Sequence, residues 1–157
     1  MDSASRAEDL HTPGYLGALY RALLELPQWV ERGIRPSAGT RYRMENGLPT
    51  VPAGAAARGG VQPVLTLLAD GYVRDEVRAG DTVGFTLRVE HPHPADRTIR
   101  IEWSFDGEPF AAGGPAAFHR YDAPGTHFAA VRVTANRADD LFTAIENIAR
   151  ARIVVEA

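Results

Sequence analysis

The chain has 157 residues, no cysteine, a formal net charge of −3 and 45% hydrophobic residues. This length suits one domain with an appendage, and the hydrophobic content is that of a globular protein. The lack of cysteine excludes disulfides, thiolate zinc sites and a thiol nucleophile, and the lack of a basic block argues against nucleic acid as a partner. No segment reaches the ~18 apolar residues of a membrane span, and the first residues lack the apolar core of a signal peptide.

Residues 1–33 predict an amphipathic helix that begins at Thr12-Pro13, an N-cap followed by proline, and ends at Gly33. Pro27 predicts a kink or a split into two shorter helices. The apolar residues at spacings of three and four are Leu16, Leu19, Leu23, Leu26 and Val30, and Tyr20, Leu24 and Trp29 widen this surface. We expect the helix to dock, chiefly through Leu16, Leu19, Tyr20, Leu23 and Trp29, against a catalytic domain or a second copy of the chain.

Residues 34–60 predict an extended linker, because prolines and glycines interrupt every periodic pattern. Asn46-Gly47 predicts a tight hairpin between residues 41–44 and 48–51, and Pro49 confines that hairpin to an edge.

Residues 61–157 predict a mainly β fold, a seven-stranded antiparallel sandwich of immunoglobulin type. The expected strands are Gln62–Leu68, Val73–Val77, Thr82–Glu90, Thr98–Phe105, Ala116–Tyr121, His127–Ala135 and Ile148–Glu156. Alternation predicts two inward-facing rows, Val83, Phe85, Leu87 and Val89, then Ile99, Ile101, Trp103 and Phe105. The connection between the last two strands predicts a helical turn around Leu141–Ile145.

A sequence motif begins at the end of the predicted strand Thr98–Phe105 and continues into the following segments. Trp103-Ser-Phe-Asp-Gly-Glu108 is followed by His119-Arg-Tyr121 and by Pro124-Gly-Thr126. This order resembles the polycystic-kidney-disease (PKD) domain, an immunoglobulin-like module with a W-D-F-G-D-G motif, although Ser104 replaces the first acidic residue and the loop is one residue shorter. Trp103 is expected in the core, Tyr121 as a corner tyrosine whose hydroxyl bonds to the backbone, and Gly125 in a turn.

A second resemblance lies in the helix. The run Trp29-Val-Glu-Arg-Gly33, followed by Pro36-Ser37, resembles the last helix and tail of bacterial α/β-hydrolases of the tannase and feruloyl-esterase type. The resemblance implies the C-terminal part of a hydrolase whose catalytic serine, acid and oxyanion loop lie upstream. It also implies an extracellular or periplasmic bacterial protein, although no export signal is visible.

Catalytic and metal-binding patterns are sparse. Some PKD-like modules hold calcium near strand junctions, and this chain has aspartates in predicted turns that could supply oxygen ligands: Asp70, Asp81, Asp106 and Asp122. The alternative is that these aspartates are there because aspartate forms local hydrogen bonds that favour turns. A second metal hypothesis, His91 and His93 with Asp96 and His119, competes with a solvated loop. No Gly-x-Ser-x-Gly elbow is present, and alternation predicts that the Ser104 hydroxyl faces solvent.

These patterns favour a non-catalytic accessory or interaction module, associated with a hydrolase catalytic domain and without a required cofactor. The alternative is a carbohydrate- or cell-surface-binding sandwich, which a row of exposed aromatic side chains would favour. Hydrolysis by this chain alone requires a nucleophile that the sequence does not reveal.

Overall fold

The computed structural model describes residues 16–137 and 140–157 and is mainly β, with one long helix. The elements are α2 (Leu16–Arg32), β1 (Arg43–Glu45), β2 (Leu48–Thr50), α3 (Ala55–Arg58), β3 (Val64–Ala69), β4 (Arg74–Arg78), β5 (Thr82–Glu90), β6 (Asp96–Phe105), β7 (Ala111–Ala112), β8 (Ala116–Arg120), β9 (Gly125–Arg137) and β10 (Asp140–Glu156). The predicted helix start at Thr12-Pro13 lies outside the described residues.

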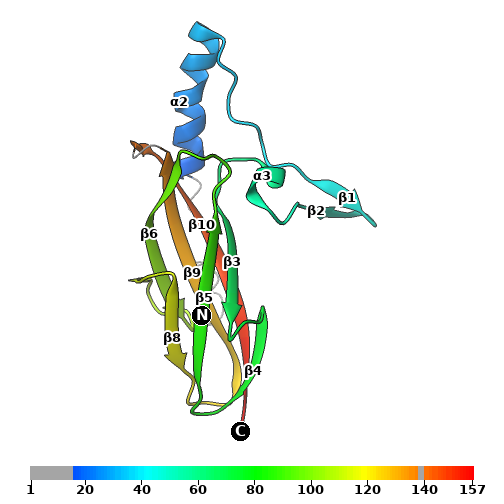
Figure 1. Ribbon diagram of the computed structural model, residues 1–157, viewed down its shortest axis with the longest axis vertical. Coiled ribbons are helices and arrows are strands. Elements are labelled where there is room, and N and C mark those ends of the chain that lie inside the picture. Colours follow the sequence, from blue (N-terminus) through cyan, green and yellow to red (C-terminus); the bar gives the residue numbers. More distant parts are fainter. Residues whose placement is uncertain (1–15, 138–139) are drawn as a thin grey trace, which may run out of the picture.

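Two sheets form the body of the molecule. One has five strands in the order β4-β10-β9-β6-β7, and the other has three in the order β3-β5-β8. The strands run along the long axis, and α2 rises from one end of the body while the β1–β2 hairpin projects sideways (Figure 1). α2 and the hairpin lie toward one end of the body, and the C-terminus lies toward the other.

The core lies between the two sheets. It gathers Leu67, Val83, Phe85 and Leu87 from the three-stranded sheet, and Trp103, Val131, Val133, Ile153 and Val155 from the five-stranded sheet. Trp103 is 5% exposed, and its indole N–H donates to the Gly114 carbonyl oxygen at 2.9 Å. The predicted burial of Trp103 beside Phe85 is therefore confirmed.

Three strand predictions were wrong in part. β4 pairs with β10 in parallel, because the chain crosses from β3 to the edge of the other sheet through a tight turn at residues 69–72. Residues around Leu141–Ile145 continue β10, since β9 extends far enough to pair with Asp140 and Ile145 on either side of an irregularity, and this pairing overrides the local preference. β7, which pairs with Glu102 and Trp103, was not predicted.

One side chain leaves its predicted face. Ile99 is 44% exposed, although alternation predicted it inside. The register between β6 and β9 shifts between Thr98 and Arg100, and an irregularity of this kind changes which face the following residues occupy.

The helix α2 is continuous through Pro27, so the predicted split does not occur. It ends where predicted: Gly33 has φ +67, and its N–H donates to the Trp29 carbonyl oxygen. No described helix is long and apolar enough to cross a membrane.

Candidate functional site: an exposed N-terminal arm

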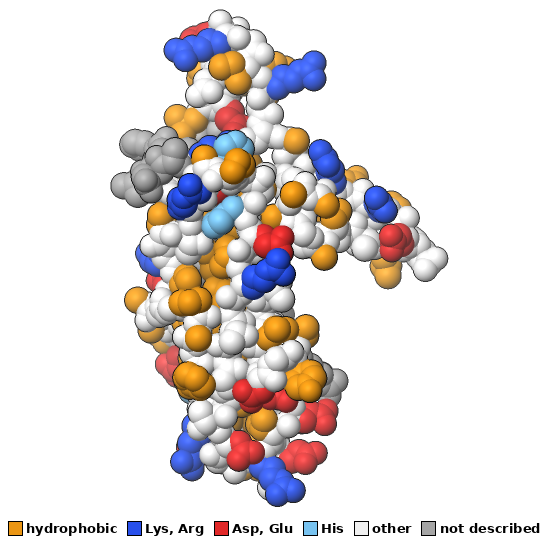
Figure 2. Space-filling model, viewed as in Figure 1, with side chains coloured by type: hydrophobic (Ala, Val, Ile, Leu, Met, Phe, Trp, Pro, Cys, Tyr) orange, Lys and Arg blue, Asp and Glu red, His pale blue; other side chains and the backbone are white. Residues whose placement is uncertain are grey.

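Residues 16–60, here called the arm, leave almost all of their side chains outside the core. Arg21 and Ala55 are its buried residues. Its exposed large apolar side chains are 44–75% exposed on α2 and just beyond it, and 43–68% exposed around the hairpin. They are Leu16, Leu19, Tyr20, Leu23, Leu24, Leu26, Trp29, Val30 and Ile34, then Tyr42, Met44, Leu48 and Val51. Figure 2 shows hydrophobic side chains spread over both projecting elements.

The side of α2 that contacts the body is small and polar rather than apolar. The helix packs on β10, where Gly17 lies so close to Ala144 that a Cβ at residue 17 would overlap the Ala144 carbonyl oxygen. Arg21, one turn further on, is 4% exposed and pairs with Glu25 at 3.4 Å. The apolar residues that the sequence placed on one face therefore point away from the chain's own core.

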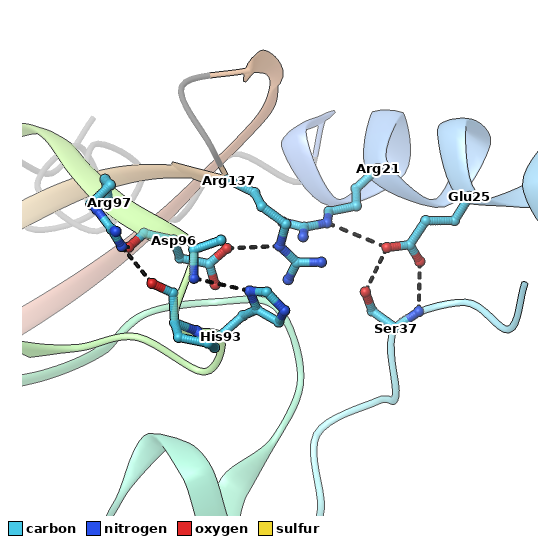
Figure 3. Close-up of polar contacts among 9 residues, drawn as sticks. Arg21, Glu25, Ser37, His93, Asp96, Arg97 and Arg137 are labelled. Carbon is cyan, nitrogen blue, oxygen red and sulfur yellow. Dashed lines mark hydrogen bonds and ion pairs between the residues drawn. The ribbon is translucent and has the colours of Figure 1, made fainter.

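Hydrogen bonds hold the linker against the helix. The N–H and the hydroxyl of Ser37 both donate to the Glu25 carboxylate, at 2.8 and 2.5 Å (Figure 3). Burial alone would raise the pKa of Glu25, but the Ser37 hydrogen bonds and the Arg21 charge together lower it. Between helix and linker lies a groove of about 650 Å³ that is lined by Trp29 and Leu26.

The same end of the body carries a buried ion pair. Asp96 is 4% exposed and accepts from Arg137 Nε at 2.9 Å. Figure 3 shows this pair at the end of the body from which α2 rises, where the helix packs on β10. Ala55 ties the second half of the arm to the body through its N–H, which donates to the Glu90 carboxylate at 3.0 Å.

The β1–β2 hairpin forms as Asn46-Gly47 predicted, with Glu45 opposite Leu48. Asn46 and Gly47 both have positive φ, as a two-residue hairpin turn requires. Every residue of β1 and β2 is exposed. Since an isolated two-stranded hairpin is marginally stable in water, a surface of this kind is typical of a segment that packs against another molecule.

The four aspartates proposed for calcium lie in separate turns, and each carboxylate has a local role. Asp70 accepts from the Gly84 N–H, Asp81 from the Arg78 N–H, and Asp122 pairs with Arg120. Within the described ranges, no group of three His, Cys, Asp or Glu residues is placed to hold a metal ion. The structure does not bring the four together.

Asp106 takes part in an acid–base pair that the sequence did not reveal. His127 Nδ1 lies 2.8 Å from Asp106 Oδ2, and His127 Nε2 lies 2.9 Å from the Ala123 carbonyl oxygen. Burial opposes a charge on His127, but the Asp106 hydrogen bond, the Ala123 carbonyl and the Asp106 charge raise its pKa. Both ring nitrogens face acceptors, so this histidine connects two turns and has no nitrogen free to act as a base toward a nucleophile.

The hydroxyl of Tyr121 corrects a prediction. Tyr121 is 2% exposed, as a corner tyrosine should be, but its oxygen is buried without a hydrogen-bond partner. Its ring contacts those of His119 and His127, at centroid distances of 4.7 and 4.9 Å, so aromatic packing rather than a backbone hydrogen bond holds this side chain. Burial, and then the Asp106 charge, raise the pKa of Tyr121. Gly125 begins β9 with φ +145, which favours glycine.

The serines show no catalytic arrangement in the part of the chain that the structure describes. Ser104 is 1% exposed and donates to the Glu108 carbonyl oxygen, so the prediction that its hydroxyl faces solvent was wrong. The loop after β6 turns back so that the Glu108 carbonyl oxygen accepts from this hydroxyl. Ser37 donates its N–H and its hydroxyl to Glu25, so a carboxylate and not a histidine accepts from this serine.

The histidines of the 91–98 loop also have local roles. His91 Nε2 lies 3.2 Å from Thr98 Oγ1, and His93 Nδ1 accepts from the Ala95 N–H. His119 stacks on Phe105 at 4.2 Å, on another strand. The proposed metal set is therefore divided between separate structural roles.

Three contacts carried different amounts of signal in the sequence, two in the arm and one in the sheets. Arg21 and Glu25 are four residues apart on a helix, a spacing that indicates an ion pair. The Ser37 contact to Glu25 depends on how the linker turns back, and the Asp106–His127 pair joins a turn to strand β9 across 21 residues. Neither contact has a sequence signature.

Comparisons with known proteins add no family to this description. No protein-family model matches the chain, and no curated protein matches it. Among solved structures, it is similar to the three N-terminal domains of the bacteriophage RB49 Highly Immunogenic Outer Capsid protein (Hoc), with a TM-score of 0.37 and 14% identity. That match covers 62% of this chain and 32% of the Hoc chain, and at this TM-score it carries no argument about fold or function.

Proposed function

We infer that this chain is a non-catalytic interaction module, built from a β-sandwich of PKD-like type and an arm that docks on a partner protein. The observation that carries this inference is the arm itself: over residues 16–60 the large apolar side chains are exposed, and the buried residues are Arg21 and Ala55. Exposed apolar surface on this scale marks an interaction site.

The resemblance of α2 and the linker to the end of a tannase-type hydrolase suggests the class of partner, a hydrolase catalytic domain. The Glu25–Ser37 contact supports a defined position for the tail that follows the helix. The accessory role then consists of holding the sandwich at a fixed place relative to that domain.

The carbohydrate-binding alternative receives less support. Phe118 lies on β8 of the three-stranded sheet, Phe128 lies on β9 of the other sheet, and Tyr42 lies beside the hairpin. Trp103, the aromatic residue of the motif, is in the core. A row of stacked sugars requires aromatic rings on one surface.

Activity measurements test the non-catalytic assignment. The purified chain should hydrolyse activated aryl esters no faster than buffer, and a serine-directed fluorophosphonate should leave it unlabelled, because Ser104 is buried and Ser37 bonds to a carboxylate. Stoichiometric labelling of any one serine, abolished by its replacement with alanine, would overturn the assignment.

A further inference from the structure

The exposed face of α2 has the spacing of a helix–helix seam. Leu16, Leu19, Leu23, Leu26 and Val30, here called the α2 stripe, alternate steps of three and four residues, as the a and d positions of a heptad repeat do. Tyr20 and Pro27 complete the same arc of the helix. No charged or polar side chain interrupts this arc between residues 16 and 30.

The α2 stripe is free of the chain's own body. Gly17 and Arg21, which contact β10 and the linker side, lie on the opposite side of the helix at 3.6 residues per turn. All five residues of the stripe are exposed, from 46% for Leu19 to 75% for Val30. The stripe is thus largely open to solvent in the described structure, and only Leu26 at its edge also lines the groove beside the linker.

The size of this surface fits a protein–protein interface. Each of these six side chains exposes on the order of 100 Å², so the stripe with Tyr20 offers roughly 600 Å². This is at the upper end of the roughly 300–600 Å² that the largest apolar patch of a typical monomer has, and about three quarters of the roughly 800 Å² per partner in a standard specific interface. A second copy supplies the same uncharged, heptad-spaced face, and no like charges oppose each other along it.

The direction of pairing follows from where the helix stands on the body. α2 begins on β10 and extends away from the sheets (Figure 1). An antiparallel pair places the two bodies at opposite ends of the paired helices. A parallel pair would set the bodies side by side, and residues 61–157 carry ten arginines against fourteen acidic residues, so that arrangement brings two like-charged bodies together.

We propose that α2 is a self-association element, through which two copies of this chain pair as an antiparallel helix dimer along the α2 stripe. This proposal rests on the interaction role of the arm and names the partner of the isolated chain. It is independent of the non-catalytic assignment, which the serine-labelling experiment tests separately.

Sedimentation velocity of the purified chain tests the association. Wild-type protein should sediment as a dimer at micromolar concentration and dissociate on dilution, and the double variant Leu19→Glu/Leu23→Glu should remain monomeric. The matched control is Leu48→Glu on the hairpin, also exposed but outside the stripe, which should dimerise as wild type does. Far-ultraviolet circular dichroism checks that each variant retains the sheets.

Single cysteines test the direction, since the natural chain contains none. Leu23→Cys, near the middle of the stripe, should form a disulfide-linked dimer on mild oxidation. Leu16→Cys and Val30→Cys should each fail alone, because in an antiparallel pair equivalent end residues lie roughly 20 Å apart at 1.5 Å per residue. A mixture of these two variants should cross-link.

Each result of the sedimentation and cross-linking experiments either supports or overturns the antiparallel dimer. A wild-type monomer at all concentrations overturns the proposal, and so does a dimer that survives the double glutamate variant or is lost in Leu48→Glu. Cross-linking of all three cysteine variants by themselves would indicate a parallel pair and overturn the antiparallel arrangement. None of these results bears on whether a serine reacts with the fluorophosphonate.

Discussion

Replacing Trp103 with alanine should remove a large part of the stability of the sandwich. The side chain is 5% exposed, lies 6.0 Å from the Phe85 ring and 6.2 Å from the Phe105 ring, and donates a hydrogen bond to Gly114. Truncation of a buried aromatic of this size costs about 3–5 kcal/mol, against a total stability of about 5–15 kcal/mol for a domain. We therefore expect Trp103→Ala to unfold at a much lower urea concentration, or to be unfolded already in buffer.

Two companion variants separate the causes. Trp103→Phe keeps an aromatic ring but leaves the Gly114 carbonyl without its donor, and it should cost about 1–3 kcal/mol. Trp29→Ala, the same change at a 52% exposed position, should cost less than about 0.5 kcal/mol. Urea unfolding followed by circular dichroism measures all three. A cost below about 1 kcal/mol for Trp103→Ala, or an equal cost at Trp29, would refute the assignment of Trp103 to the core.

Two further predictions concern contacts absent from the sequence patterns. Because the pKa of His127 is raised in the folded state, its contribution to stability is fully present below about pH 6.5 and is lost as pH rises through the folded value. The urea midpoint should therefore fall less steeply with rising pH in Asp106→Asn than in the wild-type chain; asparagine tolerates the local φ of +50. The same slope in both proteins would show that Asp106 does not raise the pKa of His127. Gly17→Ala should push the base of α2 away from Ala144 and speed amide hydrogen exchange in the helix. Gly39→Ala is the control, because a Cβ there meets nothing within 4 Å and should leave the exchange rates of α2 unchanged. Equal exchange rates of α2 in the two variants would contradict the close contact at Gly17.

The sequence predicted the sandwich well where local pattern decides. Alternation placed Val83, Phe85 and Trp103 in the core, and Asn46-Gly47 located the hairpin. Such features depend on neighbours in the chain, which a periodic pattern records. The same reasoning found the apolar face of α2, because helical spacing does not depend on what covers it.

The failures have a common cause in contacts between distant segments. The parallel pairing of β4 with β10 depends on how the chain crosses between sheets, and the exposure of Ile99 depends on a register shift between β6 and β9. The burial of Ser104 accompanies a hydrogen bond to Glu108 in the loop after β6, and the Tyr121 hydroxyl lacks a partner because no acceptor from another segment reaches it. None of these contacts leaves a periodic trace.

Hydrogen exchange of α2 tests the central claim most directly, namely that the arm belongs to an interface rather than to the core of this chain. In the monomeric Leu19→Glu/Leu23→Glu variant, the amides of α2 should exchange far faster than those of β9, because the helix is held to the body by one small polar face. In the wild-type chain, protection of α2 should rise with protein concentration while that of β9 stays constant. Protection of α2 equal to that of β9 in the monomeric variant would contradict the account and assign the helix to the chain's own core.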